Sequence, residues 1–159
     1  MTRLGKQSLL AVTFLLAGGT VPSAAAEPPA DLCSLLPAAQ VSKALGKTYD
    51  SPTKSVAPRP YPNTAQGTDC NYAAKGGSDL LFRAYVDPSP SAAKELFARL
   101  KMFYSPPTPV SELGDEAYFD PQHAIHVRKG KVRYYLALTN DPAVEKPLKD
   151  LASQVAGQL

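Results

Sequence analysis

The sequence predicts a single α+β domain in which helices pack on one face of an antiparallel sheet built from two hairpins. Residues 70–86 and 125–138 each alternate apolar and polar residues around a glycine-containing turn, the pattern of a β-hairpin. Residues 89–104 and 141–159 repeat apolar residues at the period of an amphipathic helix. Because the helices do not alternate singly with strands, a parallel doubly wound sheet is not expected.

Residues 1–26 are expected to be a secretory signal peptide. A short basic start precedes an apolar run over 9–17, and Ser23 to Ala26 supplies the small residues that a signal peptidase requires. The run is too short to span a bilayer, which takes about 20 residues. No cysteine precedes Cys33. We therefore expect cleavage near Ala26 and an unlipidated product, with no transmembrane segment, in the periplasm or the medium.

The remaining domain, 27–159, opens with a short helix that ends near Leu45. Pro37 suits the first turn of that helix, and Gly46 suits the position just after its end. Residues 50–68 are rich in proline and poor in apolar residues. This composition predicts a long loop, and loops of that length in a compact domain are either mobile or functional.

The first hairpin has a register that its loop length decides. A three-residue loop pairs Tyr72 with Leu80 and Cys70 with Phe82, so that the apolar side chains share one face. A two-residue loop would invert that face, because a slip of one residue turns every side chain over. We predict the three-residue loop, with Gly77 supplying the positive φ that it needs.

The second half repeats the order of hairpin and helix. Ser89 begins a helix that runs to about Tyr104, and a short strand is expected over 117–119. The second hairpin is predicted to turn at residues 129–130. That turn matches Val127 with Val132 and Ile125 with Tyr134 on the inner face, and it leaves His126 outward, opposite Arg133. A last helix follows from Asp141 to the end of the chain. This register and these helix bounds are inferred only from the alternation of apolar residues and from residues typical of helix ends.

Cys33 and Cys70 are the only cysteines of the chain, so their pairing is unambiguous. In an oxidising compartment we expect them to form a disulfide. By the chain-entropy estimate such a bond contributes ~4 kcal/mol to the free energy of unfolding. The alternative is a redox pair or a zinc site, but no Cys-x-x-Cys spacing is present.

The motifs of the domain also resemble a known family. The run 31–37 together with Cys70-Asn71-Tyr72 resembles small exported bacterial proteins, many of them actinobacterial lipoproteins with a domain of unknown function. The runs 113–118 and 127–130 resemble the second half of that family. The resemblance implies the same disulfide and a PsbP-like or Mog1-like sheet. It implies no activity, and this chain departs from the lipoprotein members in lacking the lipidated cysteine.

Charge and motif content argue against several classes of protein. The formal charge of +3 includes Arg3 and Lys6 of the signal peptide, and a nearly neutral domain is not expected to bind nucleic acid. His123 and His126 are the only histidines, and on one strand they would point to opposite faces. No metal or cofactor is therefore expected. No nucleophile elbow or phosphate loop occurs, so catalytic residues are not assigned and a hydrolase is disfavoured.

Two segments are candidate binding sites. The first is the outward face of the second hairpin, with His126, Arg128, Lys131, Arg133 and Tyr135. Such a strip would suit an anionic envelope polymer, phospholipid headgroup or acidic protein, or it would only keep a solvent-facing strand soluble. The second is the proline-rich loop, with Tyr49, Arg59 and Tyr61, since ordered loops often carry function; its alternative is disorder.

These observations lead us to expect a monomeric, exported binding or accessory protein of the bacterial cell envelope rather than an enzyme. Its partner would be an envelope macromolecule. One alternative is a small-ligand carrier with a pocket between the sheet and the helices, and another is an inhibitor or immunity-type protein.

Overall fold

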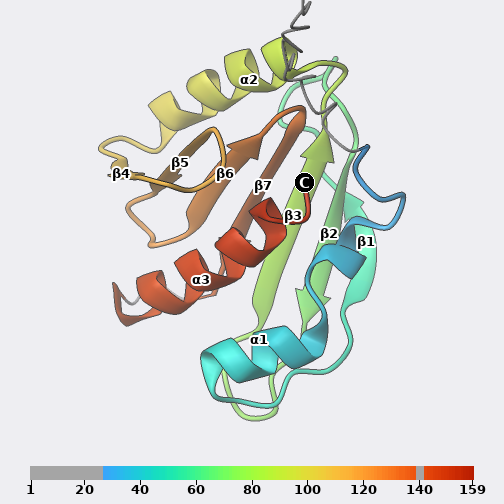
Figure 1. Ribbon diagram of the computed structural model, residues 1–159, viewed down its shortest axis with the longest axis vertical. Coiled ribbons are helices and arrows are strands. Elements are labelled where there is room, and N and C mark those ends of the chain that lie inside the picture. Colours follow the sequence, from blue (N-terminus) through green and yellow to red (C-terminus); the bar gives the residue numbers. More distant parts are fainter. Residues whose placement is uncertain (1–26, 139–141) are drawn as a thin grey trace, which may run out of the picture.

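The computed structural model describes residues 27–138 and 142–159, and the expected signal peptide lies outside them. The described residues form one antiparallel sheet of seven strands, in the order β1-β2-β3-β7-β6-β5-β4, with three α-helices around it (Figure 1). The α+β class, the antiparallel sheet and the Cys33–Cys70 disulfide are confirmed. None of the helices described is long and apolar enough to cross a membrane.

The strands are β1 (Thr53–Ala57), β2 (Gly67–Tyr72), β3 (Leu80–Val86), β4 (Thr108–Val110), β5 (Glu116–Phe119), β6 (Ile125–Lys129) and β7 (Val132–Ala137). The helices are α1 (Ala38–Leu45), α2 (Pro90–Phe103) and α3 (Glu145–Ala156), with short 3-10 segments at Leu32–Leu35 and Pro142–Val144. The Ser89 side chain caps α2 by accepting a hydrogen bond from the backbone N–H of Ala92, as a serine at that position favours.

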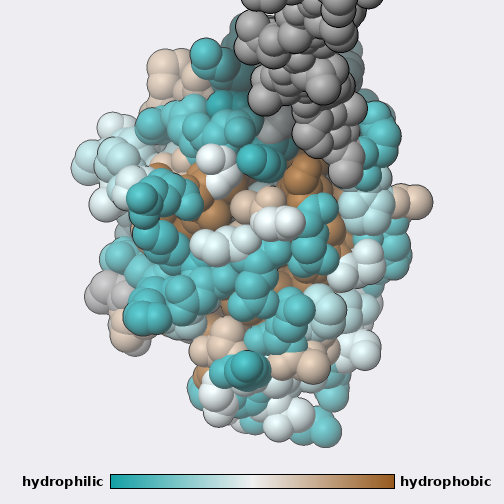
Figure 2. Space-filling model, viewed as in Figure 1, coloured by the Kyte–Doolittle hydropathy of each residue, from teal (hydrophilic) through white to brown (hydrophobic). Residues whose placement is uncertain are grey.

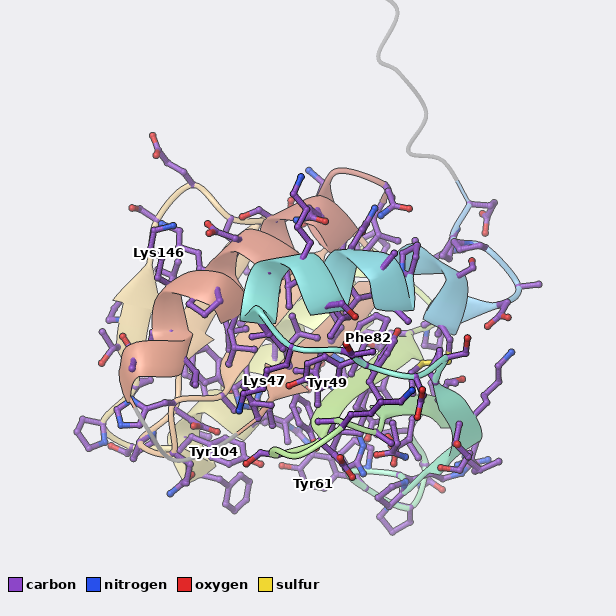
Figure 3. The ribbon with its side chains drawn as sticks, turned by 90° about the horizontal axis from the view of Figure 1, so that it is seen from below. Lys47, Tyr49, Tyr61, Phe82, Tyr104 and Lys146 are labelled. Atoms are coloured by element: carbon purple, nitrogen blue, oxygen red, sulfur yellow. A yellow bond between two sulfur atoms is a disulfide. The ribbon has the colours of Figure 1, made fainter. Side chains whose placement is uncertain are left out.

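The inner face of the sheet, as we call the face covered by α1 and α3, holds the main apolar core (Figure 3). The predicted register of the first hairpin is confirmed, since Cys70 pairs with Phe82 and Tyr72 with Leu80. The positive φ of its turn lies at Gly76 rather than at Gly77. Figure 2, drawn from the side of α3, shows hydrophilic residues over that helix and hydrophobic ones in the gaps beside it.

The disulfide joins the first 3-10 segment to β2. Cys33 and Cys70 are both buried, and the bond spans a sequence separation of 37 residues. It fixes the first 3-10 segment of the domain against the inner face, which α1 also covers.

The placement of α2 corrects one detail of the predicted architecture. All helices were expected on one face, but α2 packs on the opposite, outer face. The Phe97 ring lies with its centroid 5.2 Å from that of Tyr118, and Lys101 Nζ lies 3.0 Å from Glu116 Oε1. The physical reason is that the outer face of β5–β7 also carries aromatic rings that must be buried. In the sequence these rings alternate with the apolar residues of the inner face, at positions that otherwise hold polar residues.

Two further predictions were wrong in detail. Residues 50–68 are not all loop, because β1 forms the sheet edge and pairs with β2; the loop is residues 58–66. The second hairpin turns at Gly130-Lys131, since Lys129 pairs with Val132, and Gly130 takes the positive φ of +55°. The turn lies one residue later than predicted, so the pairing shifts by two residues; each side chain keeps its predicted face, but His126 lies opposite Tyr135 instead of Arg133. The strand β4 was not anticipated.

Candidate binding pocket

A cavity of about 350 Å³ lies on the outer face of the sheet, between α2 and the loop 58–66. Its volume falls within the range of small-molecule sites, roughly 300–1,000 Å³. The helix contributes Phe97, Leu100 and Phe103, and Tyr104 follows it; the loop contributes Pro58, Arg59, Pro60 and Tyr61; the sheet contributes Arg83, Tyr85, His126, Arg133 and Tyr135. Tyr134 also borders the cavity, although its hydroxyl reaches α3 on the inner face. We call this cavity the outer pocket.

Two ion pairs form the sheet side of the outer pocket. Arg83 binds Asp69 through two hydrogen bonds of 2.5 and 2.7 Å, and Arg133 binds Asp87 through two of 2.5 and 3.0 Å. The Arg133 and Asp87 side chains are 3% and 0% exposed. The hydrogen bond with Asp69 raises the pKa of Arg83 further above its ordinary value, despite the opposing effect of burial. Buried charges require such pairing.

The paired guanidinium groups also lie against tyrosine rings. Arg83 Cζ is 5.5 Å from the centroid of the Tyr135 ring, and Arg133 Cζ is 4.9 Å from that of Tyr85. Tyr85 stands opposite Gly67, where an added Cβ would come within 2.5 Å of the tyrosine ring. The glycine therefore lets this ring lie across β2, and the two cation–π contacts fix two walls of the outer pocket.

His126 is held within a stack of aromatic rings. Its ring centroid is 4.7 Å from that of Tyr118, 4.9 Å from that of Tyr104 and 5.1 Å from that of Tyr135. Its Nε2 atom lies 3.0 Å from Asp120 Oδ2. Burial acts to raise the pKa of Asp120, but the hydrogen bond with His126 and the backbone N–H group of Ala124 outweigh it, and the pKa lies below its ordinary value.

The loop 58–66 closes the other side of the outer pocket through its own hydrogen bonds. Arg59 donates to the Thr64 carbonyl at 2.6 Å and to Gln66 Oε1 at 3.3 Å, while Gln66 donates to the Ala57 carbonyl at 2.6 Å. Tyr85 reaches across and donates its hydroxyl to the Pro58 carbonyl at 2.8 Å. These contacts give the loop a defined conformation next to the sheet.

The outer pocket combines residues from both predicted binding sites. His126, Arg133 and Tyr135 of the hairpin meet Arg59 and Tyr61 of the loop. The hairpin face is not the solvent-facing strand that was expected, because His126 is 6% and Arg133 2% exposed. The cover provided by α2 and the loop explains this correction.

Three predicted site residues lie elsewhere. Arg128 is 8% exposed and donates to Asp115 at 2.8 Å, and Lys131 contacts Glu27 at 2.6 Å. Tyr49 lies on the inner side of the sheet, away from Tyr61 (Figure 3), and its hydroxyl donates to the Ser78 carbonyl. The residues of each predicted site are therefore not all found together.

Several residues of the outer pocket were not predicted to be site residues. Arg83 and Tyr85 occupy the outward positions of β3, between the apolar residues that defined its inner face. That alternation was a usable signal, but only the pairing of β3 with β7 places them beside the second hairpin. The apolar side of α2 was expected to pack on the same face as the other helices, whereas its Phe97, Leu100 and Phe103 line the pocket, with Phe103 73% exposed at its edge.

Comparisons of the chain with family models, curated proteins and solved structures find no match. The resemblance to exported lipoprotein-like domains therefore stays a prediction. Within the described residues, no group of three or more His, Cys, Asp or Glu side chains is placed to hold a metal ion.

Proposed function

We propose that the protein is an exported, non-catalytic binding protein that holds a small organic ligand in the outer pocket. The observation that supports this is the combination of apolar walls with polar groups left unused. Among the described residues, the hydroxyls of Tyr61, Tyr104 and Tyr135 make no hydrogen bond. A mostly apolar cavity with a few convergent polar groups is the usual form of a ligand site.

The state of the ionisable groups favours binding over catalysis. A general base must be free to accept a proton near neutral pH. The carboxylates behind the pocket are bound to Arg83 and Arg133, and His126 is packed among rings with Nε2 against Asp120. Burial raises the pKa of Tyr135 to about 12, so its hydroxyl stays protonated. These groups can position a ligand by hydrogen bonding.

An extracytoplasmic location is part of the same proposal. The apolar run and small residues of 1–26 favour export, and the Cys33–Cys70 disulfide suits an oxidising compartment. The macromolecular partner first expected has less support, because the basic strip that would have met it is divided. Arg128 and Lys131 are taken by Asp115 and Glu27, and Arg133 is buried.

The test is whether the native protein carries a small molecule in this pocket. Protein purified from the exported fraction of the producing cells is denatured, and the released molecules are measured by mass spectrometry. We expect about one molecule per wild-type chain and almost none in Leu100→Trp, whose larger side chain fills the outer pocket. Ala98→Trp is the matched control, because Ala98 is exposed on the same helix and its variant should retain the ligand.

Thermal unfolding of both variants establishes that they are folded. Wild-type protein without any bound small molecule, or equal loading of wild type and folded Leu100→Trp, would contradict the proposed function.

A further inference from the structure

We propose that the ligand of the outer pocket is a flat organic anion, a system of one or two rings that carries a single negatively charged group. The charged group would meet Arg59, and the rings would pack against the tyrosines. This inference rests on the proposed function and adds the chemical class of the ligand to it. The charge of the lining, the contacts of the rings and the size of the cavity support it.

The permanently charged side chains in the lining of the outer pocket are all positive. The lining includes three arginines and one histidine, and no aspartate or glutamate. Arg83, Arg133 and His126 each have a carboxylate partner that does not itself line the pocket. A ligand cation would meet the guanidinium groups of Arg83 and Arg133 without meeting an acid, so the lining disfavours it.

Arg59 is the residue that can bind the negatively charged group of a ligand. Within the part of the chain that the structure describes, its guanidinium donates only to neutral acceptors, the Thr64 carbonyl and the Gln66 side chain. A guanidinium has five N–H donors in a planar fork that matches a carboxylate or a phosphate. Arg59 therefore keeps donors available at the edge of the pocket, and a charge-assisted hydrogen bond is stronger than a neutral one.

The tyrosine rings favour the flat part of such a ligand. The guanidinium groups of Arg83 and Arg133 lie over Tyr135 and Tyr85, so the negative π-face that would attract a cation is already engaged. A further ring can still pack by offset or edge contacts. Tyr61 and Tyr104 lie on this same outer side of the sheet, opposite α1 and α3 (Figure 3), and Phe97 adds an apolar wall.

The size of the cavity excludes the larger ligands with the same chemistry. A volume of about 350 Å³ is near the lower limit for small-molecule sites. It accommodates a one- or two-ring molecule and not a polymer segment or a complete lipid. The Phe103 ring, 73% exposed at the edge, extends the apolar wall toward solvent.

A series of naphthalene probes of matched shape tests the ligand class. Ligand-free protein, obtained by unfolding and refolding with the disulfide intact, is titrated by isothermal calorimetry with 2-naphthoate, 2-naphthamide and 2-naphthylmethylammonium. Naphthoate should bind about 10-fold more tightly than naphthamide, and the ammonium compound should not bind measurably. Decanoate, a flexible anion, should bind more weakly than naphthoate because it lacks the flat ring.

Substitution of Arg59 separates the charge from the rings. Because Arg59 also holds the loop, Arg59→Gln is assessed by the ratio of the two affinities, and it should weaken naphthoate binding about 10-fold more than naphthamide binding. Arg99→Gln removes the same charge from the exposed side of α2, where Arg99 contacts Glu95, and should change neither. Equal affinity for naphthoate and naphthamide, or an unchanged ratio of the two affinities in Arg59→Gln, would overturn the ligand class.

The two proposals can fail separately. If 2-naphthoate does not bind at millimolar concentration, or if native protein releases a neutral or cationic molecule, the ligand class is wrong while the proposed function stands. If the native protein carries nothing that Leu100→Trp excludes, the proposed function is wrong whatever the probes do.

Discussion

The two faces of one sheet bury their polar groups by different means. On the inner face the tyrosines donate their hydroxyls to backbone carbonyls, Tyr72 to Leu36 and Tyr134 to Ala152. Burial raises the pKa of both tyrosines well above the ordinary value, so these donors keep their protons. The outer face also has a tyrosine of this kind, Tyr85, which donates to the Pro58 carbonyl, but it differs in burying ions, held as the pairs of Arg133 with Asp87 and of Arg83 with Asp69.

Because of this difference, the inner face of this small domain contributes mainly to stability, and the outer face provides the proposed binding site. Neutral hydroxyls that donate to backbone carbonyls leave no unpaired charge where the inner face packs against α1 and α3. Ion pairs and stacked rings set fixed distances between side chains, and the space left between them and α2 is the outer pocket. The buried Tyr118 hydroxyl has no hydrogen-bond partner among the described residues, which also marks the outer face as the less completely satisfied one.

The largest expected effect is on the ion pair of the outer face. Asp87→Ala leaves Arg133 buried without a counter-charge, and we expect a loss of about 3–5 kcal/mol in the free energy of unfolding, measured by urea denaturation at pH 7. The double variant Asp87→Leu/Arg133→Met should recover most of that loss, because removal of both charges leaves no unpaired ion. A loss below about 1 kcal/mol in the single variant would show that the pair is not buried as described.

The inner face should affect stability alone. Leu148 is fully buried on α3, and Leu148→Ala should lose about 3 kcal/mol through the missing contacts and the cavity left behind. The folded variant should bind 2-naphthoate as the wild type does, because Leu148 lies on the other side of the sheet. Lys146→Ala, at an exposed position of the same helix, should change stability by less than about 0.5 kcal/mol. Altered probe binding in Leu148→Ala would break the separation of the two faces.

The comparison also explains which parts of the fold the sequence predicts. The inner face follows from alternation, since Cys70, Tyr72, Leu80 and Phe82 are apolar at every second position and a slip would expose them all. The strand β1 was missed because Thr53–Ala57 is exposed at four of its five positions and has no apolar period. Its existence depends on pairing with β2, which is a tertiary contact.

The outer pocket could be predicted only in part, for a related reason. A charged residue on a strand usually indicates solvent, and nothing local distinguishes Arg133, which meets Asp87 across a sequence separation of 46 residues. Alternation correctly put Arg133 and Tyr135 on one face, even though the turn was misplaced by one residue and the pairing therefore by two. The cover over them required knowledge of where α2 packs, and an apolar stripe on a helix does not say which face of the sheet it meets.

The smallest expected effect concerns the pH dependence of the outer face, through Asp120. Its pKa is lower in the folded protein than the ordinary value of 3.8, so the folded state binds the proton less readily than the unfolded state does. Stability from this group is therefore complete above the ordinary pKa and is lost as the pH falls through the folded pKa. Asp120 faces His126 and the backbone N–H groups of Gln122 and Ala124.

Asp120→Asn removes this dependence while keeping an oxygen that accepts from the same backbone groups. At pH 7 the variant should be less stable than the wild type by about 1–2 kcal/mol, because a hydrogen bond to a charged group is lost. The difference between the two proteins, measured by urea denaturation from pH 7 down to pH 2.5, should shrink as the wild type becomes protonated. A difference that stays constant over that range would mean that Asp120 is not held as an ion, and the stack around His126 would then depend on ring packing alone.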